Sequence, residues 1–266
     1  MEAQHHLPRL TFGAGPPLPG PRTLPAEVAV ALSFNGTTQA VMMASPTDLV
    51  DFAYGFTLSE GIATPMEIAS VDPVETQDGI DLQIWLHDDA EARLAGRRRS
   101  MAGPVGCGLC GIDSLAEALR PPRLVPPSTF TMNPAEVMAA IASLPAAQPL
   151  HDATRAVHAA GFWAGGLLAV REDVGRHNAL DKLIGHLVRQ PLREGAVLLT
   201  SRVSIDMVQK VCAFGAPILI AVSAPTAQAV AMADNAGLTL IALARPDRFE
   251  AFTHANRLTP ETADVA

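Results

Sequence analysis

The strongest constraint on the fold is the alternation of short apolar runs with amphipathic segments in the second half of the chain. The apolar runs predict strands at 167–170, 197–200, 217–222 and 238–242. The segments between them have apolar residues at helical spacing and predict helices at 178–189, 204–214 and 226–235. Strands that alternate with helices of this length form a mostly parallel sheet with helices on its faces. We therefore predict an α/β fold with a mostly parallel sheet and flanking helices.

The first half of the chain predicts a smaller α+β unit. Two apolar runs flank Asn35-Gly36, a pair typical of a β-hairpin with a type I′ turn. A helix is expected from Ser45 to Glu60, and a strand over residues 80–86. The first 25 residues are rich in Pro and Gly, and we expect them to form a loose arm.

The prolines at 121, 122, 126 and 127 indicate a linker, which we take as the domain boundary. The predicted organisation has three parts: a flexible arm over residues 1–25, a small α+β domain over 26–125, and an α/β cofactor-binding domain over 126–266. With 266 residues, 48% of them hydrophobic, the chain is long and apolar enough to bury a large core.

Composition limits the partners and the compartment. The formal net charge of −8 argues against general nucleic-acid binding, which needs a broad basic surface. The start of the chain lacks the pattern of a secretory signal, and no apolar run approaches the length of a membrane span. Three cysteines are too few for a disulfide scaffold. We expect a cytoplasmic protein without membrane association.

Cys107 and Cys110 lie three residues apart in a glycine-rich loop. The neighbouring basic run at 97–99 and a helix predicted to begin near residue 114 are expected to lower the pKa of these thiols. Glycines at 103, 106, 108 and 111 allow the loop to move. A mobile, exposed thiolate suits sulfur transfer between proteins. Cys212, inside a predicted helix, is expected in the core.

Other interpretations of the cysteine pair remain open. A zinc site needs two further ligands, and the chain has no second C-x-x-C and no H-x-E of the kind that zinc deaminases use. In a thioredoxin-like oxidoreductase the C-x-x-C lies near the start of a βαβ unit, whereas here it precedes a linker. The pair could also be purely structural. We predict no metal site.

Polar loops follow the predicted strands of the second half, where open α/β sheets bind ligands. Three of these loops lead into helix N-termini, which attract anions. Arginines in the four loops add donors suited to phosphate, namely Arg176, Arg202, Arg245 and Arg248. The pattern favours a nucleotide or polyphosphate ligand, with candidate contacts at Arg176, His177, Ser201 and Arg202. The same loops could simply cap helices, and His177 could equally be a packed ring.

Several motifs together resemble the FdhD/NarQ family of formate dehydrogenase accessory sulfurtransferases. The longest is VREDVGRHNALDKLIG at 170–185. Further similar segments are found at 43–46, 55–56, 59–61, 106–111, 157–160, 222–226 and 249–254. The resemblance extends from about Glu27 to Leu258.

The resemblance implies a sulfurtransferase that takes persulfide sulfur from an L-cysteine desulfurase. The sulfur passes to the molybdenum of the bis(molybdopterin guanine dinucleotide) cofactor, and formate dehydrogenase then becomes active. By similarity Cys107 is the persulfide carrier, and Cys110 assists or relays. The resemblance also implies that a guanine nucleotide can occupy the cofactor site. The non-enzymatic alternative is a molybdenum cofactor chaperone, and a zinc-dependent deaminase-like hydrolase is a further one.

The resemblance further implies a cytidine-deaminase-like large domain without zinc, a homodimer, and apo formate dehydrogenase as a partner. The implied cofactor-binding segment consists of Phe249, Glu250, Ala251, Phe252, Thr253 and His254. The sequence departs from the family pattern in three places. Arg155-Ala156 stands where Gly-Gly is frequent, Ser201 where Gly is usual, and Phe252 where Tyr is usual.

Overall fold

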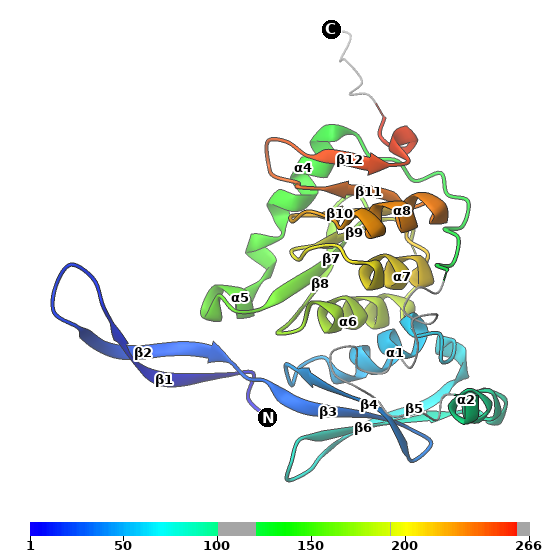
Figure 1. The fold of residues 1–266 in the computed structure, drawn as a ribbon, viewed down its shortest axis with the longest axis horizontal. Coiled ribbons are helices and arrows are strands. Elements are labelled where there is room, and N and C mark those ends of the chain that lie inside the picture. Colours follow the sequence, from blue (N-terminus) through cyan, green and yellow to red (C-terminus); the bar gives the residue numbers. More distant parts are fainter. Residues whose placement is uncertain (101–120, 192, 260–266) are drawn as a thin grey trace, which may run out of the picture.

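The computed structural model describes residues 1–100, 121–191 and 193–259. A six-stranded and a four-stranded sheet lie on opposite sides of a layer of helices, and a two-stranded hairpin extends away from both (Figure 1). In this described part of the chain, no helix has the length and apolar character needed to cross a membrane.

The six-stranded sheet is the centre of the second half and has the order β12-β11-β10-β9-β7-β8. Its strands are β7 (His158–Trp163), β8 (Leu167–Asp173), β9 (Ala196–Leu199), β10 (Ile218–Ala221), β11 (Thr239–Ala242) and β12 (Glu250–Thr253). β9, β10 and β11 are parallel, whereas β7 and β12 run antiparallel to their neighbours. The predicted α/β class with flanking helices is confirmed, and the sheet is mixed: its β9-β10-β11 centre is parallel, whereas the other three strand pairs are antiparallel.

Helices cover both faces of this sheet. One face packs against α6 (Arg176–Val188), α7 (Ile205–Phe214) and α8 (Ala227–Ala236), and the other packs against α4 (Pro134–Ser143). Along β9, Val197 and Leu199 face the first group while Ala196 and Leu198 face α4. Burial on both sides explains why the central strands are continuous apolar runs rather than alternating ones.

The four-stranded sheet has the order β4-β3-β6-β5. Its strands are β3 (Val28–Phe34), β4 (Thr37–Ala44), β5 (Ile68–Glu75) and β6 (Ile80–Leu86), followed by α2 (Asp88–Ser100). Asn35 and Gly36 both have positive φ, 47° and 75°, as a type I′ turn requires, so the predicted hairpin is confirmed. One face of the sheet packs on α1 (Leu49–Ser59), which corresponds to the predicted helix.

Two glycines allow the halves of the molecule to pack closely. Gly55 of α1 and Gly185 of α6 face each other where the helices cross. A Cβ atom at Gly55 would lie 1.7 Å from the Asp181 carbonyl oxygen, and one at Gly185 would lie 1.8 Å from that of Asp51. Only glycine leaves room for this approach, so α1 is shared between the two sheets.

The first 25 residues do not form the expected loose arm. They form the antiparallel strands β1 (Gln4–Thr11) and β2 (Leu18–Pro25), paired along their whole length. The two strands tolerate their prolines because these all belong to the same alternate set of cross-strand residue pairs. The prolines are Pro8, Pro19, Pro21 and Pro25. Alternate antiparallel pairs exchange no hydrogen bonds, so the missing N–H groups face outward.

The sequence analysis did not predict several further elements. These are β5, β7, β12, α4, α5 (Pro149–Thr154) and the short 3₁₀ turns η1 (Pro65–Glu67), η2 (Pro145–Ala147) and η3 (Ala255–Arg257). α6 also begins earlier than predicted, at Arg176, because Gly175 is its N-cap. The predicted division into three domains stays a prediction, and its boundary at residue 125 lies in an irregular stretch.

Candidate functional site

A cavity of about 780 Å³ lies at the carboxyl ends of β9, β10 and β11, the edge where the sequence predicts a ligand. Thr200 and Val222 line it directly after β9 and β10, and Ala244 lines it two residues after the end of β11. Its wall is completed by the segment from α4 to β7 and by the loop after β11. The residues concerned are Ile141, Ala142, Leu144, Pro145, Gln148, His151, Asp152, Arg155, Ala156, Val157, His158, Arg245 and Pro246. We call this space the strand-end cavity.

Positive charge surrounds His158, the first residue of β7. Because β7 runs antiparallel to β9, its first residue lies at the same edge as the carboxyl end of β9. Burial lowers the pKa of His158 below its ordinary value. The positive charge of Arg176 lowers this pKa further, and His151 and His177 act in the same sense, whereas the Asp173 carboxylate raises it. A cavity with this electrostatic environment favours an anionic ligand.

Buried contacts hold the α5 wall of the cavity in place. The Glu172 carboxylate accepts hydrogen bonds from the backbone N–H groups of Leu150 and His151, at 2.9 and 2.7 Å. These groups belong to the first turn of α5, so the carboxylate anchors the helix at its N-terminus. Arg155 follows the helix in a left-handed conformation, with φ of 60°.

Arg245 supplies a second guanidinium to the cavity wall. Its Nη1 donates to the carbonyl oxygens of Val222 and Ala244, at 2.5 and 2.9 Å. These carbonyls fix the side chain while its remaining N–H groups stay available, since the guanidinium has five donors. Arg155 and Arg245 are thus two arginines on a roomy cavity, which is the donor set that phosphate groups prefer.

Arg176 and His177 lie in the first turn of α6, close enough to His158 for their charges to affect its pKa. The Nε2 atom of His177 lies 3.5 Å from Oδ2 of Asp206 at the start of α7. Nε2 is buried and forms no hydrogen bond among the described residues beyond this contact. The contact with His177 lowers the pKa of Asp206, so the two side chains are coupled near the predicted ligand edge.

Ser201 and Arg202 directly follow Thr200 on the cavity wall. Ser201 is buried, and its hydroxyl donates to the backbone oxygen of Arg202 at 3.1 Å. The Arg202 side chain is exposed. The predicted group of four therefore gathers at the carboxyl edge, although none of its members is among the residues that line the cavity itself.

The segment 249–254 runs alongside β11 as the outermost strand of the sheet, so its residues extend from the carboxyl end of β11 toward the start of that strand. β12 runs antiparallel to β11, so Glu250 pairs with Ala242 near the cavity while Thr253 pairs with Leu240. Thr253 Oγ1 hydrogen bonds with the backbone of Leu238 and Leu240, and His254 Nε2 with the Asp234 oxygen. Phe249 packs beside the core cluster next to α4, whereas Ala251 and Phe252 are exposed. Cofactor binding by this segment stays a prediction.

Cys107 and Cys110 lie outside the described residues, as does the helix expected near residue 114. Cys212 is buried in α7, as the sequence predicts. Burial raises the pKa of its thiol to about 12. Cys212 is therefore a neutral thiol and is unsuited to act as a nucleophile.

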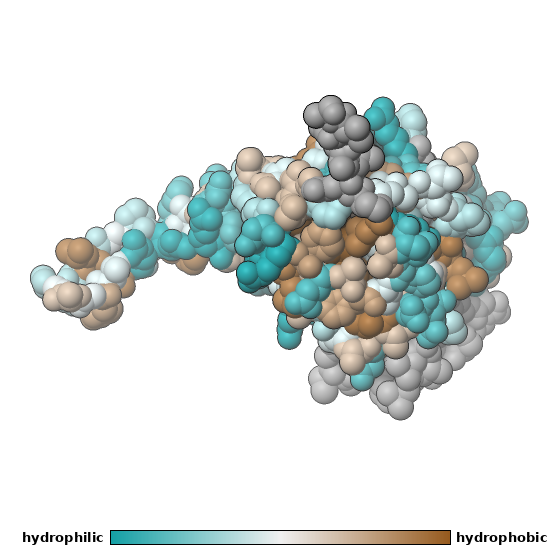
Figure 2. Space-filling model, turned by 90° about the horizontal axis from the view of Figure 1, so that it is seen from above, coloured by the Kyte–Doolittle hydropathy of each residue, from teal (hydrophilic) through white to brown (hydrophobic). Residues whose placement is uncertain are grey.

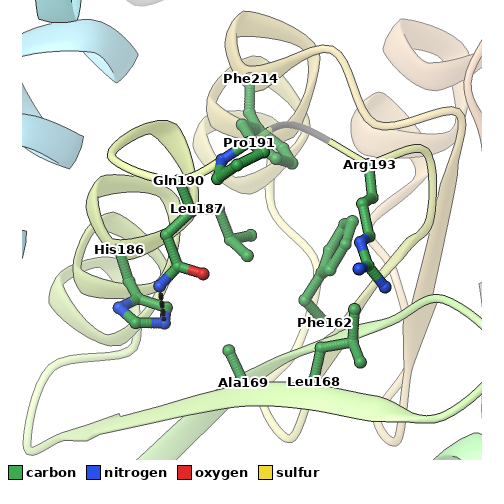
Figure 3. A pocket seen from close by; sticks show the side chains of 9 residues that line it. All are labelled: Phe162, Leu168, Ala169, His186, Leu187, Gln190, Pro191, Arg193 and Phe214. Atoms are coloured by element: carbon green, nitrogen blue, oxygen red, sulfur yellow. Dashed lines mark hydrogen bonds between the residues drawn. The ribbon is translucent and has the colours of Figure 1, made fainter.

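A second, smaller cavity of about 290 Å³ lies at the opposite edge of the sheet (Figure 3). Its lining comes from the far end of β7, the start of β8 and the last turns of α6 and α7. The His186 ring at its rim lies 2.8 Å from the Gln190 amide and 2.7 Å from Arg171. Burial and the Arg171 charge lower the pKa of His186. None of the predicted site residues lines this cavity.

Within the described ranges, no three His, Cys, Asp or Glu side chains converge as metal ligands would.

The FdhD/NarQ family model matches residues 25–259. The chain belongs to the FdhD/NarQ family. It is 50% identical over 264 residues to the sulfur carrier protein FdhD of Agrobacterium fabrum, covering 97% of both chains. It is 54% identical over 242 residues to the sulfur carrier protein FdhD of Brucella abortus, covering 89% of this chain and 90% of the relative.

Among solved structures, this FdhD/NarQ chain is similar to a protein from Desulfotalea psychrophila that is described as a formate dehydrogenase accessory protein. The TM-score is 0.76 at 24% identity, and the match covers 97% of this chain and all of the other. At this identity the likeness supports the fold alone, and it agrees with the mixed α/β architecture above.

The sequence analysis assigned no ligand role to three residues that line the strand-end cavity: His151, Arg155 and His158. His158 falls within a segment similar to the family at 157–160, but that similarity did not indicate a role. His151 and Arg155 belong to α5 and its end, and a six-residue helix has too little periodicity to be recognised.

Proposed function

We propose that this protein is a sulfur carrier that accepts persulfide sulfur on Cys107 and delivers it to a molybdenum cofactor. One observation carries the proposal: relatives that share half of their residues with nearly the whole chain bear the name sulfur carrier protein FdhD. The chemistry of the cysteines supports it. The thiol of Cys212 is buried, which leaves the Cys107–Cys110 pair for sulfur transfer.

The first step is thiol–persulfide exchange. The Cys107 thiolate attacks the terminal sulfur of a persulfide on an L-cysteine desulfurase, and an S–S bond forms on Cys107 while the donor leaves as a thiolate. No net oxidation is needed, because the sulfur atom keeps its oxidation state. The enzyme class is accordingly a sulfurtransferase with a cysteine persulfide intermediate.

Delivery to the metal requires sulfide, whereas the persulfide carries sulfur at oxidation level zero. Reducing this sulfur to sulfide takes two electrons, and Cys110 can supply them. Its thiolate attacks the Cys107 sulfur atom, which forms a Cys107–Cys110 disulfide and releases hydrosulfide to the metal. A cellular thiol then reduces the disulfide and restores the pair. The three-residue spacing suits this relay role.

The strand-end cavity is the proposed site of the cofactor, bis(molybdopterin guanine dinucleotide), which is bound as substrate. Its volume lies within the usual range for small-molecule sites. Arg155 and Arg245 would bind phosphate groups, and His158 and Arg176 would add to the positive potential. A guanine nucleotide alone would then occupy the same site.

The proposed partners are an L-cysteine desulfurase as donor and apo formate dehydrogenase as recipient of the sulfurated cofactor. We place the reaction in the cytoplasm and assign the protein as a homodimer, as the family resemblance implies.

The decisive experiment is intact-mass analysis after incubation with a cysteine desulfurase and L-cysteine. The wild-type chain should gain a sulfur atom that a reductant removes. Cys107→Ser should gain none, whereas Cys110→Ser should load sulfur but deliver none. Cys212→Ala is the matched control and should behave as wild type. Absence of any gain in a folded wild-type chain would leave a cofactor chaperone as the better assignment.

Nucleotide binding tests the cavity separately. Isothermal titration with GDP should give binding to wild type, and Arg245→Ala should weaken it at least about tenfold, because a charged hydrogen bond is lost. Arg248→Ala is the matched control: this arginine is exposed, and its nearest carboxylate is that of Asp247 at 3.9 Å. Equal losses of GDP affinity in the two variants would show that nucleotide binding depends on the overall charge of the protein and not on the cavity.

A further inference from the structure

The N-terminal hairpin leaves many apolar side chains in water. We call residues 4–25, with strands β1 and β2, the arm. Figure 1 shows that the arm extends away from the rest of the chain, and Figure 2 shows apolar residues at its free end. The large exposed apolar side chains are Leu7, Leu10, Phe12, Leu18 and Leu24, and Phe12 is 74% exposed. An isolated two-stranded hairpin is marginally stable in water, so a surface that covers the arm is expected.

Among the described residues, the arm contacts the body of the molecule only at its base. Arg22 donates to the Thr154 carbonyl oxygen at 3.1 Å, and Ala26 donates to Ala3 at 2.8 Å. The terminal ammonium lies 2.8 Å from the Glu75 carboxylate. At about 3.4 Å per residue, the eight-residue strands reach roughly 27 Å. Most of that length therefore has no support from the core of the described part of the chain.

The four-stranded sheet has an unusual outer face. Its inner face, with Leu32 and Ile84, packs on α1, and the strand register places every second side chain on the opposite side. We call that opposite side the outer face. Its exposed apolar residues are Val41, Met43, Val74 and Trp85, of which Val41 is 51% and Trp85 43% exposed. An outer face in water is normally polar, so this one has the character of an interface.

The two surfaces carry opposite charges. Residues 1–25 contain Arg9, Arg22 and two histidines against a single carboxylate. Strands β5 and β6 with their turn contain four carboxylates and no Lys or Arg over residues 68–86. One of these, Asp81, lies on the outer face, and its Oδ1 atom is buried without a hydrogen-bond partner in the described part of the chain.

We propose that the arm of one copy of this chain covers the outer face of the four-stranded sheet of a second copy, and that the exchange is reciprocal. The arm points away from its own sheet (Figure 1), so the matching face must come from another molecule. A two-fold arrangement makes each contact twice and leaves neither surface exposed. The inference rests on the homodimer of the proposed function, and it is independent of the sulfur chemistry.

The test is a complementation experiment with full-length chains, read by analytical ultracentrifugation. An arm variant carries Leu7→Asp and Leu24→Asp, whose side chains lie on one face of the hairpin. A sheet variant carries Met43→Glu and Trp85→Glu. Each alone should sediment as a monomer where wild type is a dimer. An equimolar mixture should recover dimers, because the intact arm of the sheet variant meets the intact sheet of the arm variant.

Leu124→Glu is the matched control, since Leu124 is exposed but lies on neither surface, and it should stay dimeric. Circular dichroism checks that each variant is folded. A wild-type monomer at all concentrations, dimers in both variants, or no recovery on mixing folded variants would each overturn the proposal.

Hydrogen–deuterium exchange on the wild-type chain gives a second readout that needs no variant. Dilution below the dimer dissociation constant should lower the protection of β1, β2 and the edge strand β4 together. Unchanged protection in these strands would also overturn the proposal. Sulfur uptake measured on the same samples distinguishes the arm exchange from the proposed function. A wild-type monomer that takes up sulfur contradicts only the arm exchange. A dimer that takes up none contradicts only the proposed function.

Discussion

The Lys182 ammonium lies 2.6 Å from the Asp173 carboxylate, and both side chains are fully buried. Lys182 also donates to the Ser45 carbonyl oxygen at 2.9 Å, and Asp173 accepts from the Ser45 backbone N–H at 3.0 Å. Ser45 directly follows β4, whereas the ion pair belongs to β8 and α6. This single buried cluster therefore connects the four-stranded sheet to the helix whose first turn carries Arg176 and His177.

Asp173→Ala should lower the free energy of unfolding by about 3–5 kcal/mol, because Lys182 would be left as an uncompensated buried charge. Urea denaturation measures this. The matched control is Asp152→Ala, whose exposed ion pair with Arg155 should contribute less than about 1 kcal/mol. A loss below about 1 kcal/mol for Asp173→Ala would mean that the buried pair has no structural importance.

Gly185→Ala should destabilise the fold by at least about 3 kcal/mol. The added Cβ would lie 1.8 Å from the Asp51 carbonyl oxygen and would push α1 away from α6. Thermal or urea unfolding gives the loss. Gly166→Ala is the control, since nothing lies within 4 Å of its Cβ position. Equal free energies of unfolding for the two variants would show that α1 and α6 do not need this close contact.

The stability of the protein should fall as the pH drops below the ordinary range of histidine. The pKa of His158 is lowered by burial and by neighbouring positive charges, so the unfolded chain binds a proton that the folded chain resists. Above that range His158 is neutral in both the folded and the unfolded chain, so it no longer affects the free energy of unfolding. Urea unfolding at about pH 7 and about pH 5 should show a smaller loss for His158→Gln than for wild type. His5→Gln, on the exposed arm, is the control and should follow wild type.

Cys212 should resist alkylation in the folded protein. Burial raises the pKa of its thiol to about 12, and the nucleophile is the thiolate. Iodoacetamide near neutral pH, followed by peptide mass analysis, should label Cys212 only after denaturant is added. Rapid labelling in the folded state would require the α7 packing to open and would reinstate Cys212 as a possible sulfur carrier.

Much of the fold follows from local patterns. The Asn35-Gly36 turn was predictable because both positions need positive φ, and few residue pairs accept it. The central strands and helices were predictable because each has its own apolar period. In contrast, β7 contains the small residues Ala159, Ala160 and Gly161, which carry little strand signal. β12 was missed because its residues are mostly exposed.

By itself, the sequence determined the α/β class, the family resemblance, the cysteine pair and the strand edge at which a ligand is expected. These depend on residues that are close together in the chain. Only the tertiary structure decided that Glu172 anchors α5, that α5 brings His151 and Arg155 to the cavity, and that the 249–254 segment runs alongside β11. Such contacts join residues with no local pattern in common, and their energy comes from burial and pairing that exist only once the chain has folded.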